Sequence, residues 1–175
     1  MSTVAVHTTA VHQNPRFSEA ALARVKELIS HYPEGRQKSA LLPVLHLAQE
    51  EFSWLSVPVM DYVASLLSIR PIEVYEVASF YSMYNLKPVG RYKLEICRTG
   101  PCCLRGAEDL MGHLEAKLGI KMGETTPDGL FTLVGVECLG SCGTAPMLQL
   151  GEQFHENLTL EKADALLEEL RRRAV

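Results

Sequence analysis

Apolar residues in the first half of the chain recur at steps of three and four positions, the spacing of amphipathic helices. Four such segments lie between residue 16 and about residue 81. Ser18 and Ser56 stand where the N-caps of the first and third segments are expected, and Pro71 opens the fourth. The apolar faces of the first three segments comprise Leu22, Val25, Leu28, Ile29, Tyr32, Leu41, Leu42, Leu45, Ala48, Phe52, Met60, Val63, Ala64 and Leu67. The pattern predicts a small helical bundle.

The period changes to two after residue 88. Tyr92, Leu94 and Ile96 alternate with charged residues, which predicts a half-buried strand that runs into Cys97. We then expect a helix over residues 103–118, a strand over 130–136, short strands over 147–150 and 153–155, and a final helix capped by Thr159. One side of the expected 103–118 helix comprises Leu104, Ala107, Met111, Leu114 and Leu118. The order β-α-β-β-β-α predicts an α+β or α/β arrangement in which helices cover a small sheet.

The change of period also divides the chain. Residues 1–15 show no sustained period, and we expect them to form a flexible tail. The stretch 85–90 (NLKPVG) has the composition of a turn or linker. The expected organisation is therefore a tail over residues 1–15, a helical domain over 16–88 and a second domain over 89–175.

Composition excludes several classes of protein. With 47% hydrophobic and 22% charged residues the chain is globular in type, and its net charge of −4 argues against a nucleic-acid binder. The most apolar window, residues 57–67, is interrupted by Asp61 and is too short to span a bilayer. Residues 1–14 show no secretory signal pattern, and five cysteines are too few for a disulfide-dense scaffold.

Four of the five cysteines form two pairs, each at the end of an expected strand. Cys97 and Cys102 are spaced C-x4-C, and Cys138 and Cys142 are spaced C-x3-C. Four thiolates in this pattern are compatible with a four-cysteine zinc site, two disulfides, a redox thiol pair or an iron–sulfur cluster.

The spacing favours some of these sites over others. Zinc pairs are two to four residues apart, so both spacings are allowed for zinc, although neither is the usual C-x2-C. A C-x-x-C redox motif is absent, and nothing indicates an oxidising compartment. A [2Fe–2S] cluster needs two thiolates per iron, and the x4 spacing occurs in plant-type ferredoxins. On the spacing alone [2Fe–2S] is favoured and zinc remains open.

Nearby residues add to this interpretation. We expect the helix that begins after Cys102 to direct its positive N-terminal end at an anionic cluster, with Arg98 and Arg105 adding positive charge. Cys103 is interpreted as a helix-packing thiol. We expect no ligand role for the six histidines, which lack suitable spacing. We favour core packing for the aromatic and methionine side chains of residues 80–84.

The same residues carry a resemblance to a known family. Residues 97–102 (CRTGPC) with 104–108 (LRGAE), and residues 137–146 (ECLGSCGTAP), resemble the two ligand loops of the E-subunit family of bacterial NADH–quinone oxidoreductases. Residues 77–84 (VASFYSMY) and 126–129 (TPDG) are similar to further stretches of that family. The similarity extends from about residue 16 to residue 173, and the second cysteine loop is its most specific part.

The resemblance implies a helical N-terminal domain joined to a thioredoxin-like ferredoxin domain, with one [2Fe–2S] cluster ligated by Cys97, Cys102, Cys138 and Cys142. It implies an electron-transfer subunit of an oxidoreductase, working beside a partner that binds FMN and NADH and beside other peripheral-arm subunits. The implied location is the cytoplasmic face of the inner membrane, reached through the complex. The chain itself contains no G-x-G-x-x-G or P-loop motif, and we expect it to bind neither NADH nor flavin alone.

Two alternatives stay open at this point. Similar subunits serve NAD-linked formate dehydrogenases and hydrogenases, and the sequence does not separate these complexes. In a different class, the same four cysteines could hold zinc in a structural adaptor.

Overall fold

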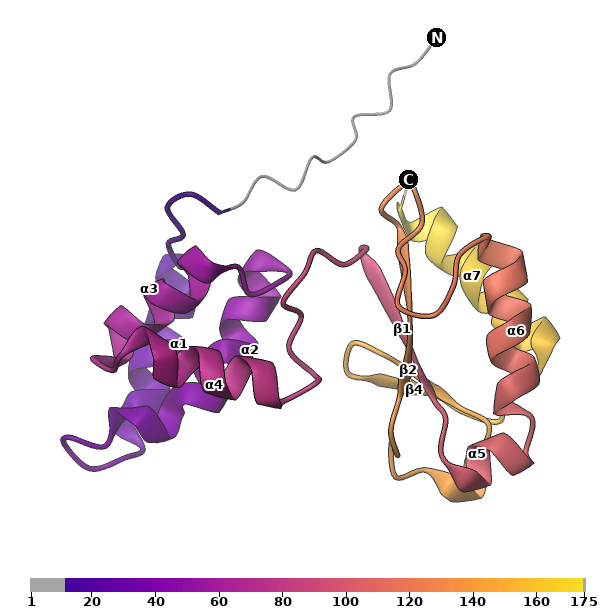
Figure 1. Cartoon of the computed structure of the whole chain (residues 1–175), viewed down its shortest axis with the longest axis horizontal. Coiled ribbons are helices and arrows are strands. Elements are labelled where there is room, and N and C mark those ends of the chain that lie inside the picture. Colours follow the sequence, from indigo (N-terminus) through magenta and orange to yellow (C-terminus); the bar gives the residue numbers. More distant parts are fainter. Residues whose placement is uncertain (1–11, 175) are drawn as a thin grey trace, which may run out of the picture. The chain divides into compact units, whose positions relative to one another are not determined.

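The computed structural model describes residues 12–174, which separate between Pro88 and Val89 into two compact units. The first unit is helical, and the second contains a sheet with its helices (Figure 1). No helix within residues 12–174 is both long and apolar enough to cross a membrane.

The helical unit contains four α-helices and one short 3-10 helix. They are α1 (Glu19–Ser30), η1 (Gln37–Ala40), α2 (Leu41–Phe52), α3 (Val57–Leu67) and α4 (Pro71–Phe80). Ser18 caps α1 as expected, its hydroxyl accepting a hydrogen bond from the Ala21 amide at 3.3 Å. The helices bury one common core that includes Val44, Leu45, Ala48, Val59 and Val63, each with no exposed surface. The predicted helical bundle is thereby observed.

Two further expectations for this unit, on the N-terminal tail and on residues 80–84, can be compared with the structure. Most of the predicted tail lies outside the described residues, but His12 Nδ1 is 3.0 Å from Ser56 Oγ and its ring packs on Trp54. The interpretation of residues 80–84 as core was wrong for Phe80, whose surface is 80% exposed, and for Tyr81 and Met83, which are also exposed. It was right for Tyr84, which is 5% exposed. The hydroxyl of Tyr84 donates to the backbone of α2, whereas Phe80 ends α4 with its side chain away from the core.

The second unit is built on a four-stranded sheet. Its elements are β1 (Tyr92–Cys97), α5 (Gly100–Leu104), α6 (Ala107–Leu118), β2 (Phe131–Val136), η2 (Cys142–Thr144), β3 (Leu148–Leu150), β4 (Gln153–His155) and α7 (Leu160–Ala174). The strand order is β2-β1-β3-β4, with β1 and β2 parallel and the other pairs antiparallel. Helices α6 and α7 lie on the same side of the sheet (Figure 1). The predicted order of elements along the chain, β-α-β-β-β-α, is observed except that two helices stand in the place of the first, and the α+β character is confirmed.

The core of this unit lies between the sheet and these two helices. Leu94 and Ile96 of the central strand β1 are fully buried, as the period of two requires. They pack with Leu110 and Leu114 of α6 and with Leu167 of α7. The central strand is therefore held on one face by both helices, which fixes the position of its last residue, Cys97.

The expected helix over residues 103–118 was wrong in one respect, because it is two helices. Gly106 adopts a φ of +96°, a left-handed conformation that ends α5 and precedes α6. Leu104, which we expected on the buried side, is 89% exposed because it belongs to α5 rather than to α6. Of the expected face in residues 107–118, Ala107 and Leu114 are buried and Met111 and Leu118 are partly buried, and Leu110, which was not expected there, is also buried.

Candidate functional site

The order of the strands brings the two cysteine pairs together. Strands β1 and β2 run parallel with Cys97 opposite Val136, so both strands end at the same edge of the sheet. Strand β3 lies on the other side of β1, and the chain between β2 and β3 must therefore pass the end of β1. Figure 1 shows α5 and the segment after β2 at this one end of the sheet. We name residues 97–102 the first cysteine loop and residues 138–142 the second cysteine loop.

Backbone hydrogen bonds join the first cysteine loop to the segments on either side of the second loop, and the two loops share one apolar cluster. The Cys97 amide donates to the carbonyl of Met147 at 3.3 Å, just beyond the second loop. Cys97 and Cys102 are each 2% exposed and pack with Ala145 and Met147. Leu139, inside the second loop, packs on the same cluster. The loops therefore lie against each other, with the first pair of thiols in the interior.

The second pair of thiols is on the surface. Cys138 and Cys142 are both exposed. Gly140 has a φ of +83°, a left-handed conformation that a side chain would strain, and its amide donates to Cys138 Sγ at 3.4 Å. The site therefore has a buried wall formed by one pair and an open side formed by the other.

The prediction that a long helix begins directly after Cys102 and directs its N-terminus at this site was wrong. Cys102 lies inside the five-residue helix α5 instead of preceding a long helix, and α6 begins only at Ala107. The expected positive charge is partly used in an ion pair, since Arg98 Nη2 lies 2.9 Å from Glu137 Oε1. This pair joins the residue after Cys97 to the residue before Cys138 and links the two loops across their exposed rim.

The pKa values of the thiols show that the four sulfur atoms act on one another. Burial raises the pKa of Cys97, but hydrogen bonds, mainly from Thr99, outweigh it and leave the pKa below its ordinary value. Burial, followed by the neighbouring Cys97 thiol, raises the pKa of Cys102 to about 11. The pKa of Cys142 is raised by the Cys138 thiol first and also by the charge of Cys97. Thiols within each pair interact most strongly, and those of different pairs interact more weakly.

The polar side-chain atoms of Cys103 and His113 make other contacts. The thiol of Cys103 donates to the carbonyl of Arg98 at 3.2 Å and is partly exposed. His113 Nε2 lies 2.8 Å from a carboxylate oxygen of Asp164, between α6 and α7. Both side chains are therefore engaged in contacts within the sheet unit.

Sequence reasoning missed one residue of the site. Glu156, between β4 and α7, accepts hydrogen bonds from the hydroxyls of Ser141 and Thr144. Ser141 directly precedes Cys142, so this carboxylate holds the end of the second cysteine loop. No local pattern marks Glu156, because its partners are brought to it by the fold.

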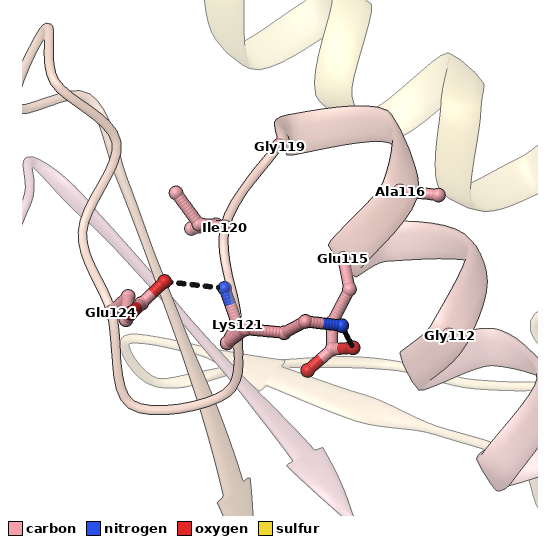
Figure 2. Close-up of a pocket in the computed structure, with 7 residues that line it drawn as sticks. All are labelled: Gly112, Glu115, Ala116, Gly119, Ile120, Lys121 and Glu124. Carbon is pink, nitrogen blue, oxygen red and sulfur yellow. Dashed lines mark hydrogen bonds and ion pairs between the residues drawn. The ribbon is translucent and has the colours of Figure 1, made fainter.

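A surface hollow at the other end of α6 offers no competing site. It has a volume of approximately 290 Å³ and is lined by residues of the α6 C-terminus and the segment that follows it. Its charged groups are engaged with each other: Lys121 Nζ contacts Glu115 at 2.9 Å, and the Lys121 amide donates to Glu124 at 2.7 Å (Figure 2). The hollow is lined from Gly112 onward, in the C-terminal half of the 12-residue helix α6, whereas Cys102 precedes the start of this helix.

The four thiols come as two pairs from two loops that lie against each other. Within residues 12–174, no three Cys, His, Asp or Glu side chains are grouped closely enough to hold one metal ion. A [2Fe–2S] cluster takes two thiolates on each iron, and the chain supplies two pairs from two facing loops. The residues present therefore fit this group.

Comparison with known proteins gives the same result. The family described as thioredoxin-like [2Fe-2S] ferredoxin matches residues 25–171. The chain is 45% identical over 158 residues to the E subunit of the NADH-quinone oxidoreductase of Rickettsia conorii, covering 90% of this chain and 95% of the relative. It is 47% identical over 153 residues to the second E subunit of the NADH-quinone oxidoreductase of Rhizobium meliloti, covering 87% of this chain and 86% of the relative.

Solved structures of a related complex are also similar. Crystal structures of an NAD+-reducing [NiFe]-hydrogenase match in the H2-reduced state, with a TM-score of 0.68 and 26% identity, and in the air-oxidized state, with 0.70 and 25%. These matches cover 75% and 81% of this chain but only 22% and 24% of the hydrogenase chains. The predictions of a thioredoxin-like ferredoxin fold and of a [2Fe–2S] cofactor are confirmed by the family match.

Proposed function

Because this chain belongs to the thioredoxin-like [2Fe–2S] ferredoxin family, we propose that it is the electron-transfer subunit of an NADH–quinone oxidoreductase. Its relatives at 44–47% identity, matched over nearly their whole length, are E subunits of that complex. In this proposal Cys97 and Cys102 hold one iron of the cluster, and Cys138 and Cys142 hold the other.

The observation that carries the proposal is the meeting of the two cysteine loops at one edge of the sheet. Parallel pairing of β1 with β2 sets Cys97 opposite Val136, two residues before Cys138. The apolar cluster around Met147 then packs both loops together. Two thiolates from each loop match the ligand count of a [2Fe–2S] cluster.

Burial gives the site a direction for electron exchange. Cys97 and Cys102 are enclosed by apolar side chains, which keep water from that side of the site. Cys138 and Cys142 are exposed, so a partner's redox group approaches from the second cysteine loop. A bound cluster carries one electron at a time, whereas NADH delivers a hydride.

That difference defines the partner. The sequence lacks a dinucleotide-binding or P-loop motif, so the hydride must be received on another chain. A flavin can take a hydride and release single electrons. We therefore propose an FMN- and NADH-binding subunit as the direct partner, within a peripheral arm on the cytoplasmic face of the inner membrane.

One observation supports a second candidate complex, an NAD+-reducing hydrogenase. The NAD+-reducing hydrogenase structures share the fold at TM-scores of 0.68 and 0.70. Their identity of 25–26% is well below the 44–47% found for the E subunits, and the chain spans less than a quarter of the hydrogenase chains. An equivalent subunit of a hydrogenase or an NAD-linked formate dehydrogenase is therefore the second candidate.

Two measurements on the full-length chain test the proposal. Purified without oxygen, the chain should contain about two iron atoms and two sulfides, and it should give an EPR signal after reduction by dithionite. A colourless chain that contains about one zinc and gives no EPR signal would contradict the proposal and support a structural adaptor.

Affinity purification from the native organism separates the complexes. Recovery with a flavoprotein and with quinone-reductase activity supports the E-subunit assignment. Recovery with hydrogenase or formate dehydrogenase activity instead would overturn that assignment in favour of the second candidate, while keeping the cluster.

A further inference from the structure

A carboxylate outside both cysteine loops holds the second loop in place. On the basis of the proposed function, we propose that Glu156 is a positioning residue that sets the geometry of Cys138 and Cys142 and places a fixed negative charge beside the cluster.

The first observation is the set of hydroxyl contacts. Oxygen Oε1 of Glu156 accepts hydrogen bonds from both Ser141 Oγ and Thr144 Oγ1. The two hydroxyls also lie 2.8 Å from each other. These residues flank Cys142 and Gly143 in the chain, so one carboxylate oxygen gathers the segment that contains Cys142.

The second observation is that the carboxylate stands on a fixed base. The Asn157 amide donates to the carbonyl of Thr144 at 2.7 Å, and the Leu158 amide donates to the carbonyl of Pro146 at 3.0 Å. Leu158 is 8% exposed and belongs to the core between the sheet and its helices. The segment after β4 is therefore joined by backbone hydrogen bonds to residues 144–146, which directly follow the second cysteine loop, and is anchored in the core.

The third observation concerns charge. No ion pair within residues 12–174 includes Glu156, whose carboxylate accepts hydrogen bonds from the hydroxyls of Ser141 and Thr144 and lies in a surface hollow that Lys162 and Arg172 also line. The hydrogen bonds from Ser141 and Thr144 hold the pKa of this carboxyl below its usual range, which keeps it ionised at neutral pH. A nearby negative charge opposes the addition of an electron, so Glu156 should lower the reduction potential.

Substitutions can separate the geometric effect from the effect of charge. Glu156→Gln removes the charge but keeps an acceptor oxygen at the end of a side chain of the same length. Glu156→Ala removes both. Glu152→Gln, in the exposed turn between β3 and β4, removes a charge that takes part in no described contact and serves as the matched control.

The test uses the full-length chain with its cluster assembled. The readouts are the reduction potential from EPR-monitored titration, the shape of the EPR signal, the rate of cluster loss to an iron chelator, and the melting temperature of the metal-free chain. In Glu156→Gln we expect a higher potential with an unchanged EPR shape and rate of loss. In Glu156→Ala we expect a higher potential, an altered EPR shape and roughly tenfold faster loss, as for a lost hydrogen bond to a charged group.

A second variant protects the test against simple misfolding. Ser141→Ala removes one of the two donors and should accelerate cluster loss by itself. Because the two residues share the Ser141–Glu156 hydrogen bond, the double variant Ser141→Ala/Glu156→Ala should lose its cluster more slowly than the product of the two single effects predicts. Additive effects would overturn the positioning role.

The remaining outcomes distinguish a failure of this inference from a failure of the proposed function. If Glu156→Ala matches Glu152→Gln in potential, EPR shape and rate of loss, the inference is overturned. If Glu156→Gln leaves the potential unchanged while Glu156→Ala releases the cluster faster, the charge effect is overturned and the positioning role stands. A wild-type chain that takes up no cluster would instead contradict the proposed function itself.

Discussion

Truncation of Met147 tests whether the buried cysteines are held by packing from the segment that follows the second cysteine loop. Met147 has no exposed surface and packs with Cys97 and Cys102. Met147→Ala removes three side-chain heavy atoms, worth about 2.4 kcal/mol at ~0.8 kcal/mol for each buried group. The cavity left behind adds to this, and measured Met→Ala losses at buried sites are about 2–5 kcal/mol. We expect a loss of about 3 kcal/mol, which lowers the melting temperature of a unit of this size by ~12–24 °C.

The assay must read the two units separately. Hydrogen exchange of peptides from β1 and β3, measured by mass spectrometry on the metal-free chain, reports the free energy of opening of the sheet unit. Fluorescence of Trp54, the single tryptophan, reports the helical unit and should not change. Met147→Leu conserves volume and should cost less than about 1.5 kcal/mol. A Met147→Ala variant within about 1 kcal/mol of the wild type, or a Met147→Leu variant equally damaged, would refute this packing argument.

Two further predictions concern the stability of the same unit. A Cβ added at Gly90 would lie 2.9 Å from the backbone carbonyl carbon of Phe131, so Gly90→Ala should destabilise the sheet unit by about 1–3 kcal/mol in denaturant titration; an unchanged midpoint would contradict this. Asp164 joins α6 to α7 through His113 and Lys117, and these hydrogen bonds hold the pKa of its carboxyl below its ordinary value. A carboxyl whose pKa is lower in the folded state stabilises the fold at pH values above its unfolded pKa, and this stabilisation is lost as the pH falls through its folded pKa. Asp164→Asn should therefore lower the melting temperature at pH 7, and the deficit should shrink below about pH 4. A deficit independent of pH would contradict that assignment.

Local patterns were sufficient for the framework of the site. The alternation around Leu94 and Ile96 predicted a strand ending at Cys97, because side chains of a strand point alternately to its two faces. Ser18 and Thr159 predicted two helix starts, because their hydroxyls accept hydrogen bonds from the first free amides. The spacing of the cysteines then favoured two pairs over one group.

Features that depend on the tertiary structure could not be predicted in this way. The apolar spacing of residues 103–118 is continuous through Gly106, and only its left-handed backbone shows that two helices meet there. Phe80 follows the helical period, yet no described element covers it. Glu156 reaches the second cysteine loop only because β4 returns the chain to that end of the sheet. In each case the deciding partner is distant in sequence.

The ligand set is tested most directly by the EPR spectrum and iron content of single cysteine variants of the full-length chain. Cys138→Ala should abolish the dithionite-reduced signal and the bound iron, because an iron left with one thiolate from its pair is open to solvent and oxidation. Cys103→Ala, which removes only a thiol bonded to the Arg98 carbonyl, should leave both unchanged. Retention of the cluster in Cys138→Ala, together with its loss in Cys103→Ala, would contradict the assignment of Cys97, Cys102, Cys138 and Cys142 as ligands.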